Sequence, residues 1–149
     1  KKHNLKHIEY ANKSIQEIFS TEDIKSAIVK TFDYPSSIIA INKGGGQFEI
    51  IALPSMVQLS SINAIQVTDL NKDGKLDLIL GGNHFDYQPQ YERLDASFVD
   101  ILLQKGNMQF EVMDPLQSGI LLKGQMRDIK KLSRLGKDQF LFLQNNPCF

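Results

Sequence analysis

The sequence predicts a mainly β protein that begins with a short helical segment. Three observations lead to this fold class: a change of pattern near residue 33, a series of short apolar runs separated by turns, and an internal repeat at an offset of 62 positions. Helical periodicity stops where the strand-like runs begin, and the repeat lies within the strand-like part alone. The sequence therefore predicts two regions, 1–33 and 34–149.

Charge and hydropathy exclude several classes of partner and structure. Seventeen basic side chains balance 17 acidic ones, so no overall field favours nucleic acid, and we expect no nucleic-acid partner. No run of 18 apolar residues occurs, so we expect no membrane-spanning segment. The single cysteine, Cys148, excludes an internal disulfide. The chain opens in the charged stretch KKHNLKH and not in a signal peptide, which indicates the middle of a longer protein.

The first region has the pattern of helices. Apolar residues recur near helical spacing up to Phe19, with charged and amide side chains between them. Ser20–Thr21 then precedes two acidic residues, and a hydroxyl cap followed by acids is a helix-start signal. We therefore expect two helices within residues 5–31, joined at Ser20–Thr21. This helical segment, 1–33, is either an insertion in the following domain or a cap on it.

From Ser36 onward the chain has the pattern of strands and turns. Short runs rich in β-branched and apolar residues alternate with Gly, Pro, Asn and Asp. We expect about eight strands and no long helix. The expected strands lie in SSIIAIN, FEIIALP, INAIQVTD, LDLILGGN, SFVDILLQ, QFEVMD, QMRDIKKLS and QFLFLQNN.

An offset of 62 positions aligns two separate stretches of this region. Lys43-Gly44 falls on Lys105-Gly106, and the sequence QFE recurs four residues after each of these lysines. At the same offset Gly74-Lys75 falls on Gly136-Lys137, and the apolar residues 78–80 fall on 140–142. Because one offset serves both stretches, a true repeat is favoured over chance.

The repeating unit holds four antiparallel strands, which is the composition of a propeller blade. The predicted fold is therefore a fragment of a β-propeller. Residues 34–54 would end one blade, 55–117 would form a complete blade, and 118–149 would start the next. Such a piece exposes apolar ends unless something caps them.

One segment, Asp69–Asp77, has the pattern of a metal-binding loop. Oxygen-bearing side chains stand at loop positions 1, 3, 5 and 9, with a glycine at position 6. Calcium takes six to eight oxygen ligands, and alternate residues of a tight loop can converge on one ion. Gly74 permits the turn, and we expect Lys75 to offer only its carbonyl while its side chain points outward. Carboxylates and an amide suit Ca²⁺ better than zinc.

Two other interpretations of this loop are open. An EF-hand needs a glutamate at position 12, where this chain has Leu80, and it needs flanking helices where strands are expected. A simple polar turn is the second alternative, because Asn, Asp and Gly are common turn formers. The shifted copy of the loop keeps Gly136 and loses the carboxylate at every ligand position, so we expect it to hold the same shape without calcium. At the 62-residue offset the four ligand positions become Lys131, Ser133, Leu135 and Gln139.

The run DLNKDGKLDLILGGN, followed by a strand and KG-x-x-QFE, resembles the FG-GAP/VCBS repeat family, which includes integrin α-subunit propellers and many bacterial surface proteins. The order of INKGGGQFE, AIQVTDLNKDGKLDLILGGN and LLKGQMRDIK is most similar to the C-terminal part of secreted VCBS-repeat proteins of Bacteroidetes type. The resemblance covers most of residues 36–146; the helical segment departs from it. It implies a propeller fold, an extracellular or cell-surface location and a bound Ca²⁺. The implied ligands are Asp69, Asn71, Asp73, the Lys75 carbonyl and Asp77.

A second candidate site is the stretch from His84 to Asp95, which is longer than an ordinary hairpin loop. Its aromatic, basic and acidic side chains suit contact with a sugar or a peptide. In the alternative interpretation Arg93 pairs with a neighbouring carboxylate and the tyrosines cover the edge of the blade. The candidate ligand-binding residues are His84, Asp86, Tyr87, Tyr91, Arg93 and Asp95.

The remaining chemistry-bearing residues give weaker signals. His3 and His7 are four apart, a spacing that can bind metal, but solvent-exposed histidines are the simpler interpretation. The sequence contains no G-x-S-x-G, H-E-x-x-H or P-loop motif. KGGGQ lies between two expected strands and not before a helix, which argues against phosphate binding.

The expected function is that of a calcium-binding extracellular β-propeller module, not an enzyme, which binds a glycan or a surface protein or serves as a scaffold. The parent protein would be secreted or lipid-anchored. The alternative is the propeller domain of a carbohydrate-active enzyme with a structural calcium ion. Fold alone does not choose between them.

Overall fold

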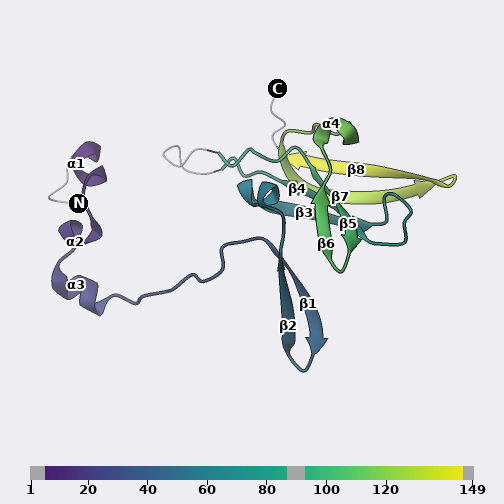
Figure 1. Ribbon diagram of the computed structural model, residues 1–149. Coiled ribbons are helices and arrows are strands. Elements are labelled where there is room, and N and C mark those ends of the chain that lie inside the picture. Colours follow the sequence, from purple (N-terminus) through teal and green to yellow (C-terminus); the bar gives the residue numbers. More distant parts are fainter. Residues whose placement is uncertain (1–5, 87–92, 146–149) are drawn as a thin grey trace. The chain divides into compact units, whose positions relative to one another are not determined.

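The computed structural model describes residues 6–86 and 93–145 (Figure 1). The chain divides into two compact units, Lys1–Pro35 and Ser36–Phe149, each of which is described by itself. The first contains helices and the second is built from antiparallel strands. The predicted mainly β class with antiparallel sheets is confirmed.

The described part of unit 1 contains three short helices, α1 (His7–Ala11), α2 (Ile15–Ile18) and α3 (Thr21–Ser26). The expectation of one continuous helix up to Phe19 was wrong. Ser14 starts a new helix because its backbone N–H donates to the Glu17 carboxylate at 2.7 Å, one half of a capping box. The predicted start of the next helix is confirmed, since the Ser20 hydroxyl accepts a hydrogen bond from the Asp23 N–H at 3.1 Å.

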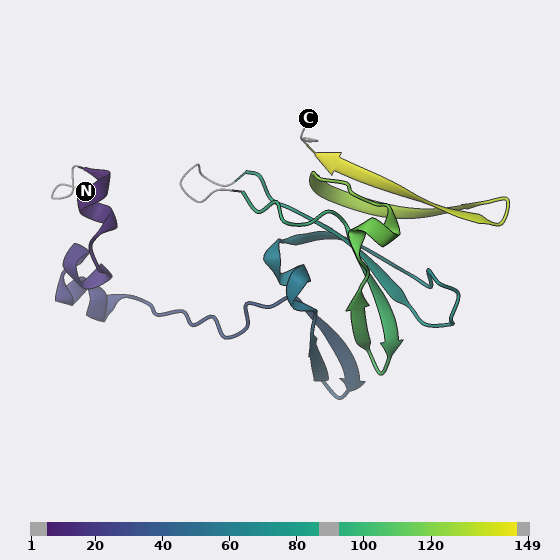
Figure 2. The ribbon, with the colours of Figure 1, turned by 45° about the horizontal axis from the view of Figure 1, so that its top comes forward.

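The described part of unit 2 holds eight strands, all paired antiparallel. A four-stranded sheet with the order β3-β4-β5-β6 lies between two hairpins, β1–β2 and β7–β8 (Figure 2). The sheets do not close into a barrel. The elements are β1 (Ile38–Gly44), β2 (Gln47–Ala52), the 3₁₀-helix η1 (Ser55–Leu59), β3 (Ile62–Thr68), β4 (Asp77–Gly82), β5 (Asp100–Gly106), β6 (Gln109–Val112), α4 (Pro115–Ser118), β7 (Gln125–Arg134) and β8 (Lys137–Asn145).

Strand β4 of the central sheet is buried on both faces. Neighbouring residues of a strand point to opposite faces, and here Ile79 and Leu80 are both 1% exposed. Ile79 belongs to a cluster that includes Met126 and Ile129 of β7, whereas Leu80 belongs to a cluster that includes Val57 of η1. One face of β4 is thus covered by β7–β8, and the other by η1 and by Ile39 of β1. A strand buried on both faces explains the continuous apolar run in the sequence.

Two glycines at the end of β4 allow these layers to approach closely. A Cβ on Gly81 would lie 2.3 Å from Cγ of Met126, and a Cβ on Gly82 would lie 2.0 Å from the carbonyl oxygen of Ser61. Both distances are far below van der Waals contact. The GGN sequence at the end of β4 therefore serves packing between layers.

Asn83, which follows these glycines, joins three other segments of unit 2. Its side-chain oxygen accepts hydrogen bonds from the Ser60 hydroxyl and the Ser97 N–H, both at 2.9 Å. Its amide nitrogen donates to the carbonyls of Ser97 at 2.7 Å and Gly124 at 3.0 Å. The residue is 1% exposed and has a φ of 75°, a left-handed conformation that Asn tolerates better than most residues. It fixes where β3, β5 and β7 begin.

The hairpins β1–β2 and β5–β6 have equivalent geometry at the 62-residue offset. The bounds of β1 become those of β5, and the ladder shifts between Asn42 and Gly44 in one hairpin and between Gln104 and Gly106 in the other. Each hairpin also carries an exposed Lys–Glu ion pair at the same place. The pairs are Lys43–Glu49 at 2.6 Å and Lys105–Glu111 at 2.7 Å.

The hairpin β7–β8 differs from β3–β4 in its connection. In β3–β4 the ladder pair next to the loop is Thr68 and Asp77, and residues 69–76 lie between them. In β7–β8 Gln139 takes the place of Asp77 and pairs with Leu132, so only residues 133–138 lie between the partners. The shorter connection lets the ladder continue to Arg134 and Lys137, with a two-residue turn. The expectation that the second loop keeps the shape of the first was therefore wrong. Lys131 and Ser133 lie in β7, and only Leu135 and Gly136 form the turn.

Replacing Asn83 tests how far unit 2 depends on this one side chain. Asn83→Ala removes four hydrogen bonds and leaves buried backbone groups unpaired, so we expect unfolding to become easier by about 4 kcal/mol or more. Asn83→Gly removes the same bonds but relieves the backbone strain, so it should be less harmful than alanine by about 1 kcal/mol. Urea unfolding measures both, and a loss below about 1 kcal/mol for alanine would contradict the assigned role.

Candidate functional site

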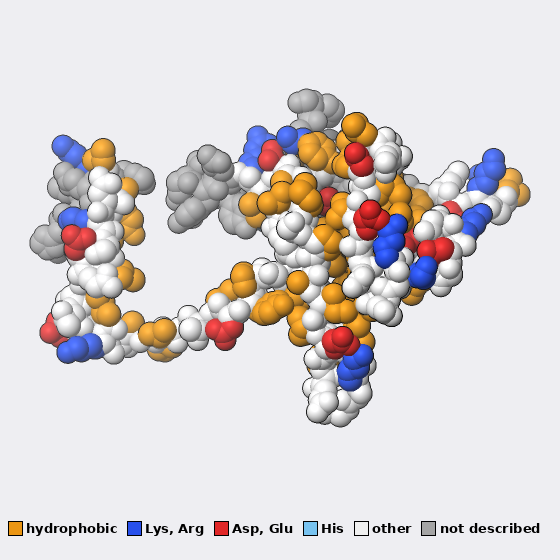
Figure 3. Space-filling model, in the orientation of Figure 1, with side chains coloured by type: hydrophobic (Ala, Val, Ile, Leu, Met, Phe, Trp, Pro, Cys, Tyr) orange, Lys and Arg blue, Asp and Glu red, His pale blue; other side chains and the backbone are white. Residues whose placement is uncertain are grey.

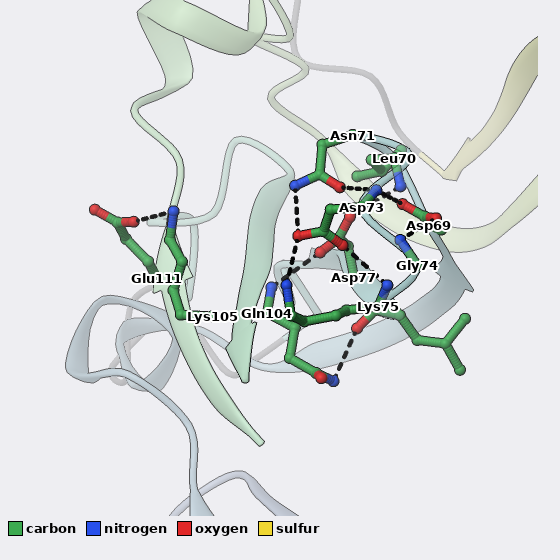
Figure 4. Close-up of polar contacts among 11 residues, drawn as sticks. Asp69, Leu70, Asn71, Asp73, Gly74, Lys75, Asp77, Gln104, Lys105 and Glu111 are labelled. Atoms are coloured by element: carbon green, nitrogen blue, oxygen red, sulfur yellow. Dashed lines mark hydrogen bonds and ion pairs between the residues drawn. The ribbon is translucent and has the colours of Figure 1, made fainter. Parts of the chain in front are cut away.

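The segment Asp69–Asp77 forms a loop between β3 and β4 that is closed by its own hydrogen bonds (Figure 4). The Asp69 carboxylate accepts hydrogen bonds from the Asp73 N–H at 3.1 Å and the Gly74 N–H at 2.9 Å. Gly74 has a φ of 83°, which a side chain would disfavour. The first carboxylate of the motif therefore draws the chain into a tight turn.

Asp73 lies at the centre of the polar contacts in this loop. Its carboxylate accepts hydrogen bonds from the Asn71 side chain at 3.2 Å, the Lys75 N–H at 2.9 Å and the Lys75 ammonium at 3.0 Å. The hydrogen bonds from the side chain and then the backbone of Lys75 are the main causes that lower the pKa of Asp73. The expectation that the Lys75 side chain points outward was wrong. It folds back because a carboxylate lies two residues away.

Asp77 differs from the other acidic residues of the loop because it is fully buried, with an exposed fraction of 0%. Its carboxylate accepts hydrogen bonds from the Leu70 N–H at 2.8 Å and from the Gln104 N–H at 2.9 Å. Gln104 belongs to β5, and its side chain also donates to the carbonyl of Leu76 at 3.2 Å. Asp77 therefore ties the loop to the neighbouring strand.

The oxygen atoms that the loop offers are of the chemical type that binds calcium. Carboxylate, amide and carbonyl oxygens are the hard ligands that Ca²⁺ prefers, and Figure 4 shows Asp69, Asn71, Asp73 and Asp77 gathered within the loop. In the part of the chain that the structure describes, no three His, Cys, Asp or Glu side chains are placed to hold a metal ion. Hydrogen bonds and the Lys75 ammonium satisfy the carboxylates in this arrangement.

The second candidate site lies after β4. His84 and Leu94 exchange backbone hydrogen bonds at 2.8 and 3.0 Å, which closes the base of the predicted long loop. The Arg93 guanidinium lies 5.3 Å from the centre of the Phe85 ring. Tyr87 and Tyr91 lie outside the described residues, as do His3 and Cys148.

Strand β7 and the residue Lys123 just before it bring further side chains to this site. Gln125 is fully buried, and its amide nitrogen lies 3.2 Å from Nδ1 of His84 and 3.5 Å from the Asp86 carboxylate. Arg127 pairs with Asp86 at 3.9 Å, and Lys123 pairs with Asp95 at 3.2 Å. The side-chain oxygen of Gln125 has no hydrogen-bond partner among the described residues. No sequence signal links Gln125, Arg127 and Lys123 to the loop, because only the packing of β7, and of the chain that leads into it, brings them there.

Comparison with protein-family models, with curated proteins and with solved structures finds no match to this chain. The resemblance to FG-GAP/VCBS repeats therefore stays a prediction from the motifs. None of the described helices is long and apolar enough to cross a membrane.

Asp77 is expected to stabilise unit 2 even without a metal ion. Asp77→Ala leaves two backbone N–H groups without an acceptor, so we expect a loss of about 2–4 kcal/mol in chemical unfolding with EDTA present. Asp77→Asn keeps one acceptor and should lose roughly half as much. Asp95→Ala, which removes an exposed carboxylate, is the control and should leave the midpoint nearly unchanged. Equal midpoints for Asp77→Ala and the control would exclude the anchoring role.

Proposed function

We propose that this chain is a calcium-binding segment of an extracellular β-propeller that binds a glycan and is not an enzyme. The observation that carries the proposal is the position of the Asp69–Asp77 loop. It connects the first two strands of a four-stranded antiparallel sheet, and β4 of that sheet packs against β7–β8 on one face and against η1 and Ile39 of β1 on the other. Stacked four-stranded sheets are the building plan of propellers.

The equivalent hairpins support the repeat on which the propeller proposal rests. β1 and β5 share their bounds at one offset, β2 and β6 share their first residue, and both hairpins share the ladder irregularity and the ion pair. The two apolar clusters repeat as well. Leu78 and Leu80 of β4 pack toward the segment that precedes the central sheet, and their counterparts Phe140 and Phe142 of β8 pack toward the central sheet, which precedes β7–β8. A unit that repeats both its strands and its contacts fits radial repetition.

Calcium would be held by Asp69, Asn71, Asp73, the Lys75 carbonyl and Asp77, and it would supply a divalent charge that joins their oxygens. Asp77 and Asp73 differ in what already holds their carboxylates. Asp77 is already fixed by two backbone N–H groups. Asp73 is held by the Lys75 ammonium, which a metal ion would have to displace. Lys75 therefore competes with calcium for Asp73.

The proposed glycan site combines the base of the 84–95 loop with β7. His84 and Asp86 offer donors and acceptors to hydroxyl groups, and Arg127 and Arg93 add charge-assisted donors. The Gln125 side chain is fully buried, so it would hold His84 and Asp86 in place and would not contact the ligand itself.

Calcium titration followed by calorimetry and thermal unfolding tests the metal site. At 100 times the dissociation constant, calcium should stabilise the chain by about 2.7 kcal/mol. The effect should be absent in Asp73→Ala and retained in Asp138→Ala, which alters an acid beside the β7–β8 turn. Lys75→Met should bind calcium roughly two- to fivefold more tightly, because the competing ammonium is gone. No saturable binding at millimolar calcium would leave the loop as a polar turn.

A glycan array, read beside a hydrolysis assay on the same sugars, tests the ligand proposal. We expect binding without product, and at least a fivefold loss of binding in Arg127→Ala. Arg134→Ala, an exposed arginine at the far end of β7, is the matched control and should bind like the wild type. Sugar hydrolysis would favour the carbohydrate-active enzyme instead. Binding that survives Arg127→Ala would place the site elsewhere.

A further inference from the structure

The two outer hairpins of unit 2 correspond in sequence to the two different halves of the central sheet. At the 62-residue offset β1–β2 corresponds to β5–β6, and β8 corresponds to β4. Within the central sheet β4 pairs with β5, through Leu78 opposite Leu102, Ile79 opposite Ile101 and Leu80 opposite Asp100. The equivalent edges of β8 and β1 have no strand partner among the described residues. Each chain thus carries one unpaired edge equivalent to that of β4, on β8, and one equivalent to that of β5, on β1.

We propose that β8 of one copy of this chain pairs antiparallel with β1 of a second copy. The result is a four-stranded sheet in the order β7-β8-β1-β2, shared between two chains. The central sheet gives the register by the repeat offset. Phe140 would lie opposite Ala40, Leu141 opposite Ile39, and Phe142 opposite Ile38 of the second copy. This inference rests on the strands alone and does not require calcium or a glycan.

Side-chain burial supports this pairing. On the outer face of β1–β2, Phe48 is 56% and Ile50 46% exposed, whereas their counterparts Phe110 and Val112 pack against the core. On β8, Leu141 is 48% exposed, whereas its counterpart Ile79 is 1% exposed. Figure 3 shows hydrophobic side chains at the surface of both units. Exposed apolar faces beside unpaired strand edges are features of association sites.

The polar residues at the proposed seam are also compatible. In the central sheet the Gln104 N–H donates to the Asp77 carboxylate at 2.9 Å, just beyond the last ladder pair. At the seam the corresponding residues are Asn42 and Gln139. The amide oxygen of Gln139 can accept the Asn42 N–H as Asp77 accepts that of Gln104. No buried charge would be left without a partner there.

A second copy fits better than an unrelated strand, because the two edges match each other in register as well as in apolar character. The interface is head-to-tail, so each chain uses β8 on one side and β1 on the other. Such interfaces close into rings or extend into chains. The eight described strands of one copy then amount to two complete four-stranded sheets per chain.

The mass of the 149-residue chain in solution tests the proposal, measured by sedimentation over a range of concentrations with EDTA and with calcium. We expect species larger than the 16.9 kDa monomer in both conditions. Leu141→Lys should raise the dissociation constant at least tenfold, because it places a charge at the seam. Leu135→Lys is the matched control, since Leu135 is 93% exposed in the turn, and it should associate normally. A monomer at every concentration would overturn the proposal.

Disulfide cross-linking between two different variants tests the register. One chain carries Ile39→Cys and the other Leu141→Cys, both with Cys148→Ser, and each must first unfold like the wild type. Opposed residues of paired strands are close enough to form a disulfide, so mixing should give a cross-linked dimer under oxidation. Pairing Ile39→Cys with Leu135→Cys should give none. Equal yields from the two mixtures, or no product from the first, would overturn the assigned register.

Discussion

Asn83 satisfies its whole hydrogen-bonding capacity with four buried bonds to Ser60, Ser97 and Gly124. These partners precede three different strands, so one side chain sets the starting points of β3, β5 and β7 relative to the end of β4. The bonds are possible because Gly81 and Gly82 let β7 and the Ser61 backbone approach β4 closely. The stacking of the sheets and the gathering of Gln125 and Arg127 beside His84 both depend on this junction.

Asp77 performs a related task at the other end of β4. It is buried, accepts two backbone hydrogen bonds, and extends the contact between β4 and β5 beyond the last ladder pair. The remaining acidic residues of the loop, Asp69 and Asp73, are solvated and bond only within the loop. The motif therefore has a buried anchor, Asp77, and a solvated part, Asp69 and Asp73.

Much of the fold follows from local sequence. The alternation of apolar runs and turns located the strands, and the Gly-Lys turns with QFE located two equivalent hairpins, because strand pairing and turn geometry are short-range properties. Continuity of a helix was harder to predict. Ser14 and Glu17 form a capping box that competes with the periodic pattern around it, and the pattern alone does not show which of the two prevails.

The sequence by itself determined the mainly β class, the oxygen-rich composition of the Asp69–Asp77 loop and the helix start at Ser20. Only the tertiary structure decided that Asp77 is a buried anchor, that Lys75 turns back onto Asp73, and that β7 supplies Gln125 and Arg127 to the 84–95 loop. The sequence also did not reveal that the β7–β8 loop is two residues shorter than the β3–β4 loop. Gly74 and Gly136 align at the 62-residue offset although the ladder register of the two hairpins differs. The physical reason is common to these cases. They depend on contacts between residues far apart in the chain, which no local pattern encodes.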